Sequence, residues 1–194
     1  TGRVTFNGAD VSKKSAHARA RLGMSRTFQI TNLFPNLTVA ENMQLALLGT
    51  SPRKFSLLGT SRLTGEDRQR IEAALSMSRL NERTDAAVRE LSYGEQRQLE
   101  MAMALVTQPR LLLLDEPAAG LSPAERVIVS DIIKSLPRDL TMILIEHDMD
   151  LVLKLVDWVT CLNNGEFLAE GSPEAISQDQ KVQDVYLGKA RENA

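Results

Sequence analysis

Leu111-Leu-Leu-Leu-Asp115-Glu116-Pro117 is the most informative segment of this 194-residue chain. Four apolar residues in a row, without alternation, are typical of a parallel strand that is buried on both faces. Asp115 and Glu116 then stand at the carboxyl end of that strand, at the edge of an open parallel sheet where ligands bind. One carboxylate can support Mg²⁺, and the other can orient or deprotonate a water molecule that attacks a phosphoryl group. The alternative is a strand that simply ends in a solvated acidic turn.

Strand and helix signals alternate on both sides of this segment. Capping boxes, in which Ser or Thr precedes Glu by three residues, open helices at Thr38, Ser92 and Ser122, the last with proline in its first turn. The alternation predicts an α/β fold around a parallel sheet. The other predicted strands are 4–6, 24–28 and a second buried strand at 141–145, with a hairpin over 159–169; the predicted helices are 15–22, 38–48, 66–78, 85–90, 92–107, 122–136, 148–156 and 172–187.

His147 follows the predicted strand 141–145. The carboxyl ends of parallel strands meet at one sheet edge, so His147 is expected beside Asp115 and Glu116, where it could hydrogen-bond a terminal phosphate. The alternative is a surface histidine next to a helix that Asp148 caps.

The segment Ser92-Tyr-Gly-Glu-Gln96 opens a predicted helix with groups that suit an anion. The Ser92 hydroxyl, the backbone at Gly94 and the free N–H groups of the first turn can bind negative charge, aided by the helix dipole. The alternative is a plain capping box without a ligand.

Composition excludes several classes of protein. Lys and Arg number 23 against 25 Asp and Glu, which argues against a nucleic-acid-binding protein with a strong basic field. The single cysteine, Cys161, excludes an internal disulfide and is predicted to pack in the core, as is Trp158. The longest apolar runs have four residues, whereas a membrane span needs about 20. The first residues read as the interior of a strand, so the chain is expected to begin partway into a domain.

Together these residues resemble the nucleotide-binding subunit of ATP-binding-cassette (ABC) transporters, and the resemblance covers the chain from end to end. Leu91–Gln96 matches the cassette signature, and Asp115-Glu116-Pro117 matches the magnesium strand with its catalytic glutamate. Ala119–Ser122 matches the loop that faces the partner subunit. His147 matches the switch histidine, and Gln29 matches the glutamine loop.

The resemblance implies a P-loop NTPase (RecA-like) fold, with a parallel sheet core and an inserted helical subdomain. Residues 1–36 would be a remnant of the N-terminal β part and glutamine loop of the catalytic lobe. Residues 37–100 would form the helical subdomain with the signature. Residues 101–194 would form the catalytic core and the C-terminal hairpin and helices.

The resemblance also implies an ATPase that uses ATP and Mg²⁺. Glu116 and His147 would be catalytic. The expected nucleotide-binding residues are Gln29, Ser92, Gly94, Glu95 and Asp115, of which Asp115 and Gln29 would also hold Mg²⁺, partly through water.

Partners follow from the same resemblance. They would be a second ABC ATPase subunit, identical or different, transmembrane permease subunits and, indirectly, a solute-binding protein, with no nucleic acid. The subunit would be cytoplasmic and peripheral on the inner face of the cell membrane. The segment from Gln29 to about Leu48 is expected to couple the ATP site to the permease, with Leu33, Phe34 and Leu37 exposed to a coupling helix. The alternative is that these three side chains pin the helical subdomain to the core.

Variations within the motifs resemble one subfamily. Tyr93 stands where a second glycine is common, Glu95 where glutamine is common, and Ser122 where many cassettes have aspartate, so the role of Ser122 is open. The first two variants and the ending 184–188 resemble importers of branched-chain amino acids. The subunit would thus power solute uptake through a separate permease, of branched-chain or other amino acids. ATPases of lipopolysaccharide export or urea and amide uptake, and a non-catalytic cassette remnant, remain alternatives.

A phosphate loop is missing from the sequence. No Gly-x-x-x-x-Gly-Lys-Ser/Thr (Walker A) occurs in the 194 residues. Such cassettes carry it upstream of a strand resembling 2–6, so the chain is expected to be N-terminally truncated, without the first strands and the phosphate loop. That loop supplies the N–H groups and the lysine that hold the phosphates, so the fragment is expected to be inactive. Its strand would lie beside Met142–Ile145, which is then expected to be an open apolar edge.

Overall fold

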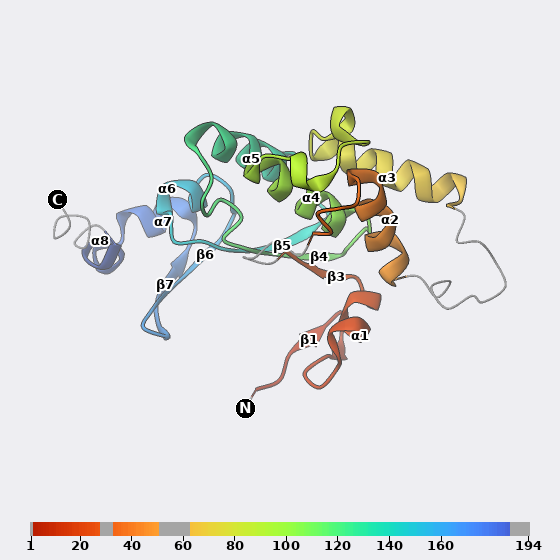
Figure 1. Cartoon of the computed structure of the whole chain (residues 1–194). Helices are drawn as coiled ribbons and strands as arrows, with labels where there is room; N and C mark the ends of the chain where they lie inside the picture. Colours follow the sequence, from red (N-terminus) through yellow and green to blue (C-terminus); the bar gives the residue numbers. More distant parts are fainter. Residues whose placement is uncertain (1, 28–32, 51–62, 187–194) are drawn as a thin grey trace. The chain divides into compact units, whose positions relative to one another are not determined.

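The computed structural model describes residues 2–27, 33–50 and 63–186 (Figure 1). The chain forms two compact units, Thr1–Ile145 and Glu146–Ala194. Each unit has its own secondary structure and its own core. The predicted division at 36/37 and 100/101 stays a prediction.

The centre of the first unit is a parallel sheet, as the alternating pattern predicted. Strands β3 (Met24–Arg26), β4 (Leu111–Asp115) and β5 (Thr141–Ile145) are hydrogen-bonded in the order β3-β4-β5. On β4, Leu112 and Leu114 are almost completely buried on one face, and on the other face Leu111 is buried and Leu113 half-buried, which together explain the unbroken apolar run. The register sets Asp115 opposite Ile145, so the acidic pair comes directly at the carboxyl edge.

Strand β5 is not the second buried strand that the sequence predicted. Its residues alternate between exposed and half-buried, and Ile143 and Ile145 are 51% and 58% exposed. Among the described strands of this sheet, β5 pairs with β4 alone, so it forms an edge. The apolar composition of 141–145 predicted a buried strand, but the burial of a strand also depends on which strands and helices lie beside it. The exposed isoleucines agree with the other expectation, that of an open apolar edge.

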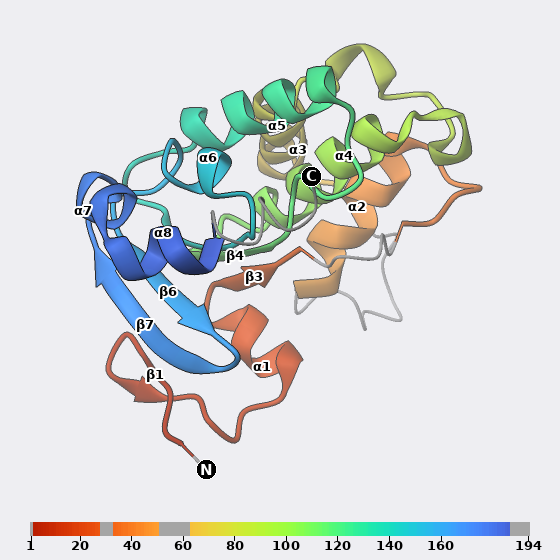
Figure 2. The ribbon, with the colours of Figure 1, turned by 90° about the vertical axis from the view of Figure 1, so that its left-hand side faces the viewer.

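Helices α4 (Tyr93–Leu105) and α5 (Pro123–Ser135) lie on one side of the sheet, and α1 (Ala16–Arg21) lies on the other side of β3 (Figures 1 and 2). Helices α2 (Val39–Thr50) and α3 (Gly65–Met77) pack against α4 and against each other. The core between these elements is aliphatic and methionine-rich, as the scarcity of aromatic residues requires. Its fully buried members include Met43, Leu80, Leu99, Met101, Leu112 and Ile132.

Local signals in the sequence explain where these elements begin. Three helices start with the predicted reciprocal Ser/Thr and carboxylate contacts, at Thr38, Ser92 and Ser122. Asn7 and Gly8 both have positive φ and turn β1 (Thr5–Phe6) into β2 (Ala9–Asp10). The predicted helix at 85–90 is instead a single 3₁₀ turn, η3 (Val88–Glu90), and another 3₁₀ turn, η2 (Asn81–Arg83), precedes that range. Among the described residues, no helix has the length and apolar character needed to cross a bilayer.

The second unit combines a hairpin with short helices. Strands β6 (Val159–Asn163) and β7 (Glu166–Gly171) are antiparallel, and Asn164 and Gly165 make the turn with positive φ, as predicted. Helices α7 (Pro173–Gln178) and α8 (Gln180–Tyr186) follow, and α6 (Met149–Val152) is shorter than the helix predicted over 148–156. Cys161 is buried, as predicted, whereas Trp158 is 62% exposed and not a core residue. The core of the unit consists of Val152, Val159, Cys161, Ile176 and Val182.

Candidate functional site

Asp115 ends β4 and is held by an ion pair. The Arg26 guanidinium, from the end of β3, donates to its Oδ2 at 2.8 Å. The Asp115 side chain is 27% exposed, so its carboxylate remains accessible. The sequence did not predict this partner of Asp115, because the two residues are 89 positions apart and come together only through the pairing of their strands. The sheet edge therefore presents a carboxylate whose orientation a neighbouring cation fixes.

Glu116 leaves the strand through a sharp change of backbone direction. Its φ is +46°, in the left-handed region that residues other than glycine seldom adopt. Its N–H donates to the Ile145 carbonyl at 2.9 Å, and its carbonyl accepts from the Ala119 N–H at 3.1 Å. The peptide chain is thus pinned on both sides of a half-buried glutamate. An unusual backbone conformation that persists at a carboxylate is typical of a functional position.

The first turn of α4 carries the predicted anion-binding groups. The Ser92 hydroxyl accepts from the Glu95 N–H at 3.1 Å, while Glu95 Oε2 accepts from the Ser92 N–H at 2.8 Å. The other oxygen of Glu95, Oε1, forms an ion pair with Arg83 at 3.0 Å. Ser92, Gly94 and Glu95 therefore lie together, and Glu95 uses one oxygen within this first turn and the other toward Arg83 of η2.

Glu125 reaches the same turn from α5, and the sequence did not reveal this contact. Its Oε1 accepts the Gly94 N–H at 3.0 Å, and its Oε2 accepts the Ser122 N–H at 3.0 Å and the Ser122 hydroxyl at 2.7 Å. The Ser122 hydrogen bonds, above all, lower the pKa of Glu125, and smaller contributions come from Gly94 and Ser92. The capping box of α5 predicted the Ser122 partner. No local pattern could predict Gly94, which is 31 residues away. Ser122 thus has a defined role as the cap of α5.

Tyr93 is fixed by a buried ion pair. Arg97 is 3% exposed; its Nη1 donates to Glu100 Oε2 at 2.8 Å, and its Nη2 donates to the Tyr93 hydroxyl at 3.1 Å. The Tyr93 ring then lies against Gly120, where a Cβ would come within 3.1 Å of the ring. The φ of Gly120 is +74°, so the position requires glycine on both grounds. The first turn of α4 therefore contacts the chain that follows Glu116 at two places: Tyr93 lies against Gly120, and Gly94 is hydrogen-bonded to Glu125.

For two of the predicted site residues, His147 and Gln29, the structure gives no position relative to Asp115 and Glu116. His147 belongs to the second unit, where its side chain is 74% exposed and its Nδ1 lies 3.9 Å from Glu146 Oε2. Gln29 lies outside the described residues. Their place beside Asp115 and Glu116 stays a prediction. Within the described ranges, no group of three or more His, Cys, Asp or Glu side chains is arranged to hold a metal ion.

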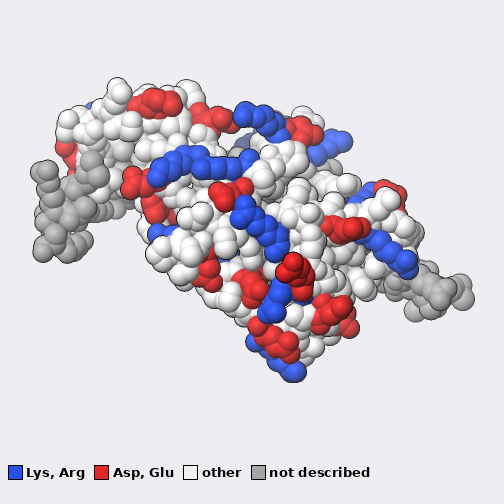
Figure 3. Space-filling model, turned by 90° about the horizontal axis from the view of Figure 1, so that it is seen from above, with Lys and Arg blue, Asp and Glu red and all other residues white. Residues whose placement is uncertain are grey.

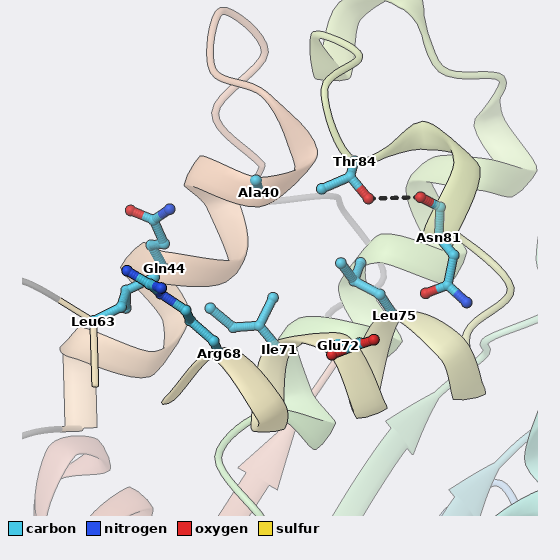
Figure 4. A pocket seen from close by; sticks show the side chains of 9 residues that line it. All are labelled: Ala40, Gln44, Leu63, Arg68, Ile71, Glu72, Leu75, Asn81 and Thr84. Atoms are coloured by element: carbon cyan, nitrogen blue, oxygen red, sulfur yellow. Dashed lines mark hydrogen bonds between the residues drawn. The ribbon is translucent and has the colours of Figure 1, made fainter. Parts of the chain in front are cut away.

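A pocket of about 460 Å³ lies elsewhere in the first unit, between α2, α3 and η2. Figure 4 shows Ile71 and Leu75 on its floor, with Arg68 and Gln44 at one side and Thr84 and Asn81 at the other. None of the predicted site residues lines it. The surface in Figure 3 mixes Lys and Arg with Asp and Glu, without a large area of one sign, in keeping with the balanced charge.

Comparison with known proteins identifies the family. The ABC transporter family model matches residues 1–119, and that of the branched-chain amino acid ATP-binding cassette transporter matches residues 168–192. The branched-chain amino acid transport ATP-binding protein BraF of Pseudomonas aeruginosa is 37% identical over 97% of this chain and 77% of its own. The branched-chain amino acid transport ATP-binding protein LivG of Escherichia coli is 39% identical over 88% of this chain and 70% of its own length.

Solved structures agree with the sequence comparison. An ATP-binding cassette of an ABC transporter in its ADP conformation has a TM-score of 0.77 and 28% identity, covering 97% of this chain and 77% of that one. A nucleotide-free cassette has a TM-score of 0.74 and 27% identity, covering 96% and 77%. The fold is therefore that of P-loop NTPases, as predicted. The chain belongs to the ABC transporter family, as an ATP-binding subunit of the kind that hydrolyses ATP.

Proposed function

We propose that this chain belongs to an ATP-hydrolysing subunit that, in a form with a phosphate loop, powers uptake of branched-chain or other amino acids through a separate permease. The observation that carries the proposal is the match of residues 168–192 to the branched-chain amino acid cassette model, which lies outside the general ABC match at 1–119. The relatives BraF and LivG, which match over most of the chain, bear names of the same transport system.

The carboxylates at the end of β4 have the chemistry that this function needs. Mg²⁺ prefers hard oxygen ligands, and the accessible carboxylate of Asp115 provides them, with Gln29 as a second expected ligand. When bound, Mg²⁺ would neutralise charge on the phosphates. Glu116 would accept a proton from the attacking water, and His147 would hydrogen-bond the terminal phosphate. The pinned backbone of Glu116 favours this role, because a base must be held in place.

The first turn of α4 suits the phosphates of ATP. It already holds an anionic oxygen at the Gly94 N–H, that of Glu125, so its groups do stabilise negative charge. In the proposed assembly, Ser92 and Gly94 of one subunit would cap ATP held by a second subunit, identical or different. Permease subunits would receive the resulting motion, and a solute-binding protein would deliver the solute. The subunit would sit on the inner face of the cell membrane.

Uptake by cells tests the solute class. A strain lacking this subunit should lose uptake of radiolabelled leucine, and the gene should restore it, whereas its Glu116→Gln variant should not. Uptake of urea should be unchanged in all three strains. Normal leucine uptake together with lost urea uptake would contradict the proposed substrate and leave the ATPase assignment standing.

A further inference from the structure

Glu125 makes one contact more than a helix cap requires. In a capping box, one carboxylate oxygen of the third helical residue accepts the N–H of the capping residue. Oε2 of Glu125 does this with Ser122, and its other oxygen, Oε1, reaches across to the Gly94 N–H at 3.0 Å. The box at the start of α4 uses its spare oxygen differently, since Oε1 of Glu95 pairs with Arg83. Glu125 thus links the start of α5 to the first turn of α4.

The contact fills the space next to Gly94. A Cβ at Gly94 would lie 2.4 Å from Glu125 Oε1 and 2.7 Å from its Cδ and Cγ. The carboxylate therefore packs directly on the backbone of the first turn of α4. The Gly94 N–H points at Oε1, so a phosphate oxygen could accept the same N–H only by taking the place of that oxygen.

Charge makes this exclusion stronger. Glu95 and Glu125 both bring a carboxylate to the first turn of α4. The positive end of the helix dipole is thereby already compensated, and the hydrogen bonds of Ser122, with smaller contributions from Gly94 and Ser92, hold Glu125 ionised by lowering its pKa. An incoming phosphate would meet a like charge at contact distance until Glu125 withdraws.

We propose that Glu125 is an internal anion that competes with the phosphates of ATP for the first turn of α4, so that the signature accepts nucleotide only when this carboxylate withdraws. The inference rests on the proposed role of Ser92 and Gly94 as phosphate-binding groups. Withdrawal also breaks the link between α4 and the start of α5. Since Glu125 binds Ser122 as well, nucleotide binding is transmitted to the loop 119–122.

Glu125→Gln tests the competition in the whole subunit, carrying a phosphate loop and Glu116→Gln so that ATP is not consumed. The amide keeps the shape of the side chain but has no charge and one acceptor oxygen instead of two. ATP-dependent dimerisation, followed by size-exclusion chromatography, should reach its midpoint at an ATP concentration roughly 3–10-fold lower than in the parent. Glu174→Gln is the matched control, because it removes the same charge from the first turn of α7, which Ser172 caps. Its midpoint should not change.

Glu125→Asp keeps the charge and the ability to cap α5 but shortens the reach toward Gly94. It should also lower the midpoint, and it carries the test if the glutamine variant is unstable in thermal melting. A midpoint equal to or above that of the parent in the folded variants would overturn the competition. Ser92→Arg separates this outcome from failure of the proposed function. If Ser92→Arg retains the ATP-dependent dimer, the phosphate-binding role of the signature is wrong and the competition falls with it. If Ser92→Arg abolishes the dimer and the Glu125 variants do not shift the midpoint, only the competition is overturned.

Discussion

Glu116 is a residue whose backbone is fixed by hydrogen bonds to Ile145 and Ala119. A single substitution can remove its charge without changing its size. Glu116→Gln keeps the size of the group but removes the charge that attracts a proton from water. In a subunit with a phosphate loop, we expect ATP turnover to fall about 10²-fold or more, as for the loss of a general base. Nucleotide binding should persist. Steady-state turnover and nucleotide affinity, measured on the same samples, check this; turnover above about a third of the parent rate would exclude a general base at Glu116.

The hydrogen bonds of Glu125 predict how acid affects stability. They lower its pKa in the folded chain below the ordinary value of 4.5. A carboxylate with a lowered folded pKa stabilises the fold above its unfolded pKa, and this stabilisation is lost as the pH falls through the folded pKa. The melting temperature of Glu125→Gln should therefore lie below that of the parent at neutral pH, and the gap should close below a pH of about 4.5. A gap that stays constant in thermal melts down to about pH 3 would contradict this account.

Helices show how much of the structure is encoded locally. The capping boxes at Thr38, Ser92 and Ser122 predicted three helix starts, because each box is complete within four residues. The Asn-Gly turns at 7–8 and 164–165 were predictable for the same reason. The link from Glu125 to Gly94 was not, since it depends on how two helices pack.

The strands show what local sequence cannot predict, namely which strand lies inside the sheet and which at its edge. The runs 111–114 and 142–145 are both apolar, yet the first is buried except for the half-buried Leu113, and the second alternates between half-buried and exposed residues. The difference arises because β4 has a hydrogen-bonded strand on each side and β5 pairs with β4 alone among the described strands. The ion pair of Arg26 with Asp115 also depends on strand order, so the sequence predicted Asp115 as a site residue and missed its partner.

The segment before α2 exposes an apolar side chain on a fixed backbone. Phe34 is 52% exposed, while its N–H and carbonyl both bind the side chain of Asn42, which is completely buried. Phe34→Asp should therefore leave the fold intact. We expect it to reduce transport by the assembled transporter at least about tenfold, a loss of about 1.4 kcal/mol of coupling, with basal hydrolysis by the isolated subunit unchanged.

Transport and hydrolysis assays on the same variant check this prediction. Val127→Asp is the control, because Val127 is 60% exposed on α5. Equal loss of both activities in Phe34→Asp would favour the alternative, that Leu33, Phe34 and Leu37 pin the helical subdomain to the core.

At the scale of the whole chain, the missing phosphate loop predicts weak nucleotide binding. Charge-assisted hydrogen bonds contribute roughly 1.5–3 kcal/mol each, so losing three removes about 4 kcal/mol or more. This corresponds to a loss of about 10³-fold in affinity. Calorimetric titration of the 194-residue chain with Mg-ATP, beside a form with a phosphate loop, measures the difference. Micromolar binding by the 194-residue chain would mean that another loop holds the phosphates.

The only cysteine of the sequence gives the second unit a built-in reporter. Cys161 is 3% exposed within its core, and desolvation, with a smaller effect of Asp179, raises its pKa. A thiol reagent attacks the thiolate, so the folded unit should react slowly. Each labelling event then requires a transient opening of the unit. The labelling rate in dilute denaturant would thus give the free energy of that opening, without interference from the first unit, which contains no cysteine.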